Sequence, residues 1–270
     1  MSSASPPSTA RTAPLLQLQG ISKRFGAVQA LSDVDFECDA GEVVALVGDN
    51  GAGKSTLVKA ISGTHPADKG RFAFEGSEVH IGSPQAAAAL GIATVYQDLA
   101  LCDNLDVVAN LYVGHEQARG LGRNLRLLDE VGMERQALGL LDRLSVTIPS
   151  VRTEVAALSG GQRQSIAVAR ATMGHPKLVL LDEPTAALGV AQTRQVLDLI
   201  LRLRDDGMGV IVVSHNLVDV FAVADRIVVL RLGRNVASLD ASDTTAEGVV
   251  AAITGAHTDE VHSTFTTEAS

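Results

Sequence analysis

The sequence predicts an α/β fold with a mixed β core, parallel central strands, an antiparallel β part and an inserted helical subdomain. Short apolar runs at 43–47, 178–181 and 209–213 have the length and β-branched content of strands that are buried on both faces, as parallel strands are. Between about residues 98 and 173 this pattern fades and apolar residues recur at helical spacing. We therefore expect a parallel sheet covered by helices, with a helical insertion.

The elements are expected in a regular order along the chain. A strand at 43–47 leads into a glycine-rich loop and a helix over 55–61. A helix over 192–204 connects the second and third apolar runs, and 226–230 with 235–239 form a late hairpin around a glycine turn. Within the insertion, the spacing predicts helices over 105–112, 121–132, 133–144 and 159–172.

One large domain accounts for most of the 270 residues. We expect it to span 15–254, with its helical subdomain at about 98–173. Residues 1–14 are rich in Ser, Pro, Thr and Ala and are expected to form a disordered tail, and 255–270 a flexible C-terminal tail. The glycine-rich phosphate motif occurs once, so no internal repeat is predicted.

Composition excludes several classes of protein. A net charge of −9 argues against a broad nucleic-acid surface. Although 46% of the residues are hydrophobic, no run approaches the roughly eighteen needed to span a bilayer, which indicates a soluble or peripheral protein. Cys38 and Cys102 lack metal-ligand or redox spacing, so we interpret both as small buried side chains in a reducing cytoplasm.

A phosphate-binding motif lies between the first apolar run and its helix. It reads Gly48, Asp49, Asn50, Gly51, Ala52, Gly53, Lys54, Ser55. Glycines let backbone N–H groups surround phosphates, and the helix N-terminus favours negative charge. In such a motif Lys54 reaches the β- and γ-phosphates, Ser55 ligates Mg²⁺ and Thr56 lies near the α-phosphate. The alternative is a glycine-rich turn that binds nothing.

Two further segments point to the same chemistry. Asp182 and Glu183 end the second apolar run, at the sheet edge where such folds bind ligands. Carboxylate oxygens at such an edge suit a hard cation, the alternative being a solvated strand end. About a hundred residues after the phosphate motif, the amides of Ser159, Gly160 and Gly161 open a helix and form an anion-binding terminus.

These motifs, in this order, resemble those of the ATP-binding cassette family, the ATPase subunits of ABC transporters. The resemblance covers about 15–255 and implies the P-loop NTPase fold of ABC ATPases. Segments 48–55, 96–101, 110–116 and 158–171 look like those of bacterial importers of monosaccharides such as ribose, xylose and fructose, here in a single-cassette form.

The resemblance implies roles for individual residues. Asp182 would hold Mg²⁺ through water, and Glu183 would be the general base. Gln97 would contact Mg²⁺ or the attacking water and couple the two subdomains. His215 would contact the γ-phosphate, and Phe25 would stack on adenine. The other histidines are interpreted as surface or structural residues: His65, His80, His115, His175, His257 and His262.

The resemblance also implies partners. In the family, the signature segment of one subunit, here Ser159, Gly160, Gly161 and Gln162, closes over the ATP of another, so a dimer of two copies or of paralogues is expected. The family docks its membrane permease on the segment matching 98–116, and the permease receives solute from a binding protein. The alternative for this segment is a purely structural role. Docking on a membrane permease would place the chain on the cytoplasmic face of the membrane.

One position departs from the family pattern, and two other functions stay open. Gly189 stands where the family usually has an aspartate, which puts communication between the two ATP sites in question more than hydrolysis itself. The alternatives are an exporter of another solute and a soluble ABC ATPase outside transport. A non-enzymatic regulatory cassette would be expected to lose Lys54, Glu183 or His215, and all three are present.

Overall fold

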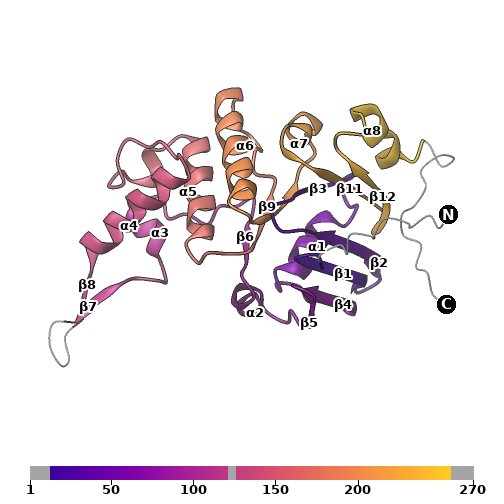
Figure 1. The fold of residues 1–270 in the computed structure, drawn as a ribbon, viewed down its shortest axis with the longest axis horizontal. Coiled ribbons are helices and arrows are strands. Elements are labelled where there is room, and N and C mark those ends of the chain that lie inside the picture. The colour runs from indigo at the N-terminus through magenta and orange to yellow at the C-terminus, as the bar shows by residue number, and fades with distance from the viewer. Residues whose placement is uncertain (1–12, 121–125, 257–270) are drawn as a thin grey trace, which may run out of the picture.

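The structure, a computed structural model, describes residues 13–120 and 126–256. It is built around a six-stranded sheet (Figure 1). The strand order is β12-β11-β3-β10-β9-β6. The strands are β3 (Val43–Val47), β6 (Ile92–Val95), β9 (Leu178–Asp182), β10 (Gly209–Val213), β11 (Arg226–Arg231) and β12 (Arg234–Asp240). All neighbours are parallel except β11 and β12, which form the late hairpin. The predicted mixed core with parallel central strands is confirmed.

An antiparallel sheet packs against one face of this core (Figure 1). Its order is β2-β1-β4-β5. The strands are β1 (Leu16–Phe25), β2 (Val28–Cys38), β4 (Lys69–Phe74) and β5 (Ser77–Val79). The helices are α1 (Lys54–Ile61), α2 (Pro84–Ala89), α3 (Val107–Tyr112), α4 (Glu130–Arg143), α5 (Gly160–Thr172), α6 (Val190–Asp205), α7 (Leu217–Val223) and α8 (Ala246–Thr254), with a 3-10 turn at Val155–Ala157.

Side chains of the central strands alternate between two hydrophobic clusters. In β9, Leu178 and Leu180 pack with α1 and the antiparallel sheet, whereas Val179 and Leu181 pack with α3 to α6. Because successive strand residues point to opposite faces, a strand covered on both sides has to be apolar throughout. This is why the sequence of β9 shows an unbroken apolar run.

The inserted region differs from the sequence expectation at one place. The helix predicted over 121–132 is wrong: Arg126–Leu128 form β8, which pairs antiparallel with β7 (Ala118–Gly120), while 121–125 lie outside the described residues. α4 begins at Glu130 because the Asp129 carboxylate caps it by accepting the Gly132 N–H at 3.1 Å. The helix then runs unbroken through the boundary that we expected at 132/133.

Most of the two expected tails lies outside the described residues, which exclude 1–12 and 257–270. Among the helices that the structure describes, none is long and apolar enough to cross a membrane.

The two cysteines have different environments. Cys38 is fully buried, as expected, but the expectation for Cys102 is wrong because Cys102 is exposed. Its loop is anchored by the buried Asn110, whose Oδ1 accepts the Cys102 N–H (2.7 Å) and whose Nδ2 donates to the Cys102 carbonyl (2.9 Å). The polar side chain of Asn110, not the thiol, therefore fastens this loop to α3.

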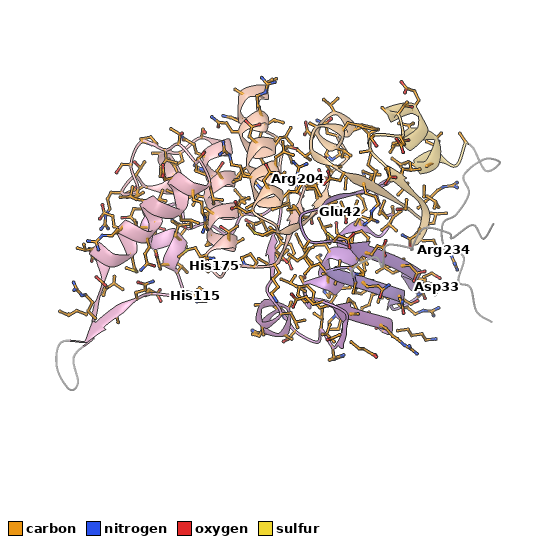
Figure 2. All side chains as sticks on the ribbon, in the orientation of Figure 1. Asp33, Glu42, His115, His175, Arg204 and Arg234 are labelled. Atoms are coloured by element: carbon orange, nitrogen blue, oxygen red, sulfur yellow. The ribbon has the colours of Figure 1, made fainter. Side chains whose placement is uncertain are left out.

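An ion pair joins strands at the amino-terminal edge of the central sheet. The Arg226 guanidinium donates to both Glu42 carboxylate oxygens, at 2.8 and 3.0 Å, and to the Glu37 carbonyl at 2.9 Å. The side chains of Arg226 and Glu42 are 14% and 15% exposed. Glu42, labelled in Figure 2, directly precedes β3, so the pair ties β11 to the entry of the central strand.

We predict that thiol reagents distinguish the two cysteines. Burial, with a further contribution from the Glu42 carboxylate, raises the pKa of the Cys38 thiol well above its usual value, so Cys38 has little thiolate and no access to reagent. One thiol per chain should react under native conditions and two after unfolding, measured with a chromogenic disulfide. A Cys102→Ser protein should show none before unfolding; native reactivity in that variant would contradict the structure.

We also predict that Arg226→Met lowers the free energy of unfolding by about 3 kcal/mol, because it leaves the Glu42 carboxylate buried without its charge partner. Urea unfolding followed by circular dichroism measures this change. The matched control is Lys177→Met, which removes a pair with Glu75 whose partners are 52% and 54% exposed and should cost less than about 1 kcal/mol. Equal costs for the two variants would show that the Arg226 pair adds no more than a surface pair.

Candidate functional site

The phosphate motif forms the loop between β3 and α1. Two of its glycines lie where a larger side chain would not fit. Gly48 has a φ of 147° and Gly53 a φ of 104°. A Cβ on Gly48 would collide with the Leu230 carbonyl, and a Cβ on Gly53 would lie 2.8 Å from the Ala30 carbonyl. Only glycine fits such close backbone approaches at positive φ. The loop conformation is thus set by packing against β2 and β11.

Lys54 lies inside this loop. Its side chain is buried, and Nζ donates hydrogen bonds to the Gly48 carbonyl at 2.6 Å and the Asp49 carbonyl at 3.0 Å. Ser55, the next residue of α1, is exposed, while Thr56 is half-buried. The predicted lysine and serine therefore occupy the first turn of the helix that the loop opens, beside the helix N-terminus.

Asp182 and Glu183 lie where β9 ends. Burial and the adjacent Glu183 carboxylate raise the pKa of Asp182, and the ammonium groups of Lys59 and Lys54 act in the opposite direction. Carboxylates at this position suit a hard divalent cation, which prefers oxygen ligands and retains water. In the described part of the chain, no group of three or more His, Cys, Asp or Glu side chains is placed to hold a metal ion.

The Glu183 carboxylate contacts His215, the residue that follows β10 by two positions. His215 Nδ1 and Glu183 Oε2 are 2.8 Å apart, and the His215 side chain is 72% exposed whereas that of Glu183 is 17% exposed. The backbone N–H of Glu183 donates to the Val213 carbonyl at 2.9 Å. The structure thus brings together the two residues that were assigned the base and the γ-phosphate contact.

Two residues beside this pair were missed from the sequence. The Thr185 hydroxyl donates to the Asp219 carboxylate at 2.6 Å, and Asp219 is only 7% exposed. This bond links the loop after Glu183 to α7, the helix after His215. An acidic residue in the first turn of a helix was the only signal for Asp219, and it reads equally well as a helix-dipole interaction.

Gln97 lies at the same sheet edge but farther away. It is exposed and follows β6, which is separated from β3 by β9 and β10. The carboxyl ends of these parallel strands lie at one edge, so Gln97, Glu183, His215 and the phosphate loop project from it in that order.

The signature segment begins α5, in a different part of the molecule from α1 (Figure 1). Ser159 and Gln162 form a capping box: Ser159 Oγ accepts the Gln162 N–H at 3.3 Å, and Gln162 Oε1 accepts the Ser159 N–H at 3.0 Å. A Cβ on Gly161 would lie 2.8 Å from Gln192 of α6, and one on Gly160 would lie 3.0 Å from Leu188. The capping box and the close helix packing account locally for this sequence.

Phe25 lies at the end of β1, with its side chain 43% exposed. The ring meets His65 edge-on, with centroids 5.5 Å apart and an interplanar angle of 89°. His65, which we interpreted as surface or structural, therefore contacts a predicted site residue.

A groove of about 760 Å³ lies between the central sheet and the inserted helices. Residues from β6, α2, α3, α5 and the loop after Gln97 line it, among them Tyr96, Asp98, Tyr112, His115 and Arg170. Arg170 donates to the carbonyls of Leu99 and Ala100, both at 2.8 Å, so α5 holds the loop that forms one wall. His115, labelled in Figure 2, lies on the same side of the molecule as His175.

Comparisons with known proteins agree on one family. The family described as "ABC transporter" matches residues 31–186. The fructose import ATP-binding protein FrcA of Rhizobium meliloti is 46% identical over 246 residues, which cover 90% of this chain and 95% of the relative. The xylose/arabinose import ATP-binding protein XylG of Sulfolobus acidocaldarius is 45% identical over 240 residues, covering 89% of this chain and 94% of the relative.

The same result comes from a solved structure. The ADP conformation of MJ1267, an ATP-binding cassette of an ABC transporter, matches with a TM-score of 0.76 and 26% identity, over 90% of this chain and 96% of that one. The predicted ABC ATPase fold is thereby confirmed. The chain belongs to the ABC transporter family and is one of its ATPase cassettes.

Proposed function

We propose that this chain binds and hydrolyses Mg·ATP as the energy-supplying subunit of a monosaccharide importer. The observation that carries the proposal is the 2.8 Å contact between Glu183 and His215 at the sheet edge from which the phosphate loop also projects. The relatives of nearly equal length that match at 46% and 45% identity are named for fructose and xylose/arabinose import, which supports sugar import over export or a role outside transport.

The binding step uses the phosphate loop. The backbone amides of Gly48, Asn50, Gly51 and Gly53 and the α1 N-terminus would bind the phosphates. Lys54 would exchange its two carbonyl contacts for phosphate oxygens, and Thr56 would lie near the α-phosphate. Ser55, Asp182 and Gln97 offer oxygen ligands for Mg²⁺, which would neutralise charge on the β- and γ-phosphates.

The chemical step uses the edge of β9 and β10. The Glu183 carboxylate would orient a water in line with the γ-phosphorus and accept its proton as the new P–O bond forms and the bond to ADP breaks. His215, held on Glu183 by its Nδ1, would contact the γ-phosphate with the rest of its exposed ring. Gln97 would contact the water or Mg²⁺ from the inserted side of the molecule.

Completion of the site requires a second cassette. α5 lies apart from α1 in one chain, so Ser159, Gly160, Gly161 and Gln162 would close over the ATP of a second copy (Figure 1). ATP bound between two copies would then stabilise the dimer, and hydrolysis would allow the copies to separate. A homodimer is the arrangement that we propose.

The groove beside Gln97 would receive a short cytoplasmic helix of the membrane permease. Its walls combine the loop that follows Gln97 with α3 and α5, so movement of Gln97 on ATP binding would reach the groove through Asp98 and Leu99. The chain would thereby be a peripheral subunit at the cytoplasmic face of the membrane. The permease and a solute-binding protein would select the sugar.

Glu183→Gln should bind ATP and remain dimeric while its turnover falls by at least about a hundredfold, because the amide cannot accept the proton of the attacking water. Steady-state phosphate release measures turnover, and size-exclusion chromatography with ATP measures dimerisation. Glu75→Gln, a change of an exposed carboxylate outside the site, is the control. Unchanged turnover in Glu183→Gln would refute the assignment of the base.

Asp98→Lys should uncouple transport from hydrolysis, because it reverses a charge on the wall of the groove without altering the phosphate loop or the Glu183–His215 pair. Sugar uptake in proteoliposomes should fall roughly tenfold, as for loss of a buried interface contact, with ATPase activity of the purified chain retained. Asp142→Lys makes the same charge change on exposed α4 and should leave uptake intact. Equal loss of uptake in both variants would argue against the groove as the docking site.

A further inference from the structure

The loop 62–68, which connects α1 with β4, contacts the end of β1, where Phe25 lies. α1 starts in the phosphate loop and ends at Ile61, and the loop after it runs alongside the end of β1. The Asp68 N–H donates to the Ser22 carbonyl at 2.9 Å. This short segment therefore spans the distance between the phosphate-binding and the proposed adenine-binding parts of the site.

Polar contacts fasten this loop to the residues just before Phe25. The Asp68 carboxylate accepts one hydrogen bond from Lys23 Nζ at 2.9 Å and another from the Arg24 N–H at 2.7 Å. Lys23 Nζ also donates to the Pro66 carbonyl at 2.7 Å, and its side chain is only 15% exposed. The hydrogen bond from Lys23, followed by that from Arg24, lowers the pKa of Asp68, so the carboxylate is charged at neutral pH.

Lys23 of β1 and His65 of the loop 62–68 also contact the Phe25 ring itself. Lys23 Nζ lies 5.5 Å from the ring centroid, in cation–π geometry, and the His65 ring meets Phe25 edge-on at 5.5 Å. Within the part of the chain that the structure describes, His65 Nδ1 is buried and has no hydrogen-bond partner. The contact between His65 and Phe25 is the edge-on packing of their two rings.

An aromatic ring that binds a base gains affinity when its orientation is fixed beforehand, since less conformational entropy is lost on binding. Phe25 is 43% exposed and lies at the tip of a two-stranded turn, where its ring would otherwise be free to change rotamer. Lys23 and the loop 62–68 hold that ring. Because this loop follows α1, they also link the ring to the phosphate loop.

We infer that His65 and Asp68 are positioning residues for nucleotide-base recognition: His65 holds the Phe25 ring edge-on, and Asp68 holds Lys23 over it. The inference rests on the proposed stacking of adenine on Phe25. It adds that ATP affinity depends on residues that touch neither the phosphates nor the base. Hydrolysis at saturating ATP does not depend on them.

The test compares ligands that do and do not carry a base. Dissociation constants for ATP and for inorganic tripolyphosphate are measured by calorimetry on the full chain with His65→Ala, Asp68→Asn, Phe25→Leu and the double variant His65→Ala/Phe25→Leu. ATPase assays give KM and kcat. Lys177→Ala, which removes the exposed pair with Glu75, is the control for loss of a surface contact outside the site. Thermal unfolding checks that each variant is folded.

His65→Ala and Asp68→Asn should each weaken ATP binding roughly three- to tenfold, as for loss of one aromatic or cation–π contact, and leave tripolyphosphate binding and kcat unchanged. Phe25→Leu should weaken ATP binding at least as much, because it removes the ring itself. His65→Phe should retain ATP affinity because it keeps a ring edge. In the double variant the effect of His65→Ala should disappear, because its contact is already lost with Phe25.

Two results would overturn the inference. The first is an equal loss of ATP binding and tripolyphosphate binding. The second is a double variant whose loss of ATP affinity equals the product of the losses in His65→Ala and Phe25→Leu. Either result would give His65 a general structural role. Wild-type protein that binds no ATP would instead overturn the proposed function, so the two failures are distinguishable.

Discussion

The parallel pairing of β10 with β3 and β9 is the constraint on which the site depends. Val213 is paired with Leu46 on one side and with Asp182 on the other, so the three strands end level. The phosphate loop, the two carboxylates and His215 therefore emerge from one edge. A shift of pairing by one residue would move the side chains of a strand to the opposite cluster and would displace its terminal polar groups relative to those of its neighbours.

The backbone at this edge is held in an uncommon conformation. Glu183 has a φ of 52°, which few non-glycine residues adopt and which persists where surrounding contacts enforce it. Its N–H bond to Val213 and the nearby Thr185–Asp219 bond supply such contacts. His215, by contrast, is largely exposed and contacts the Glu183 carboxylate through Nδ1, so its ring can turn toward a bound nucleotide while the carboxylate stays in place.

Local patterns predicted the central strands and the phosphate loop because each depends on neighbouring residues and on burial. The hairpin at Arg126–Leu128 was missed because its leucines suggest helical spacing although Leu127 and Leu128 are each 49% exposed. Contacts such as Phe25–His65 and Thr185–Asp219 join residues 40 and 34 positions apart. No local pattern encodes such pairs, because they arise from packing of distant elements.

The most direct test of the account is sugar uptake by proteoliposomes that contain this chain with the permease that co-purifies with it from native membranes. Uptake would be measured with a panel of monosaccharides delivered by the cognate solute-binding protein, with ATP on the side of the cassette. The account predicts ATP-dependent accumulation of a monosaccharide that is lost with Lys54→Ala. ATP hydrolysis without uptake of any monosaccharide, or uptake that persists in Lys54→Ala, would contradict it.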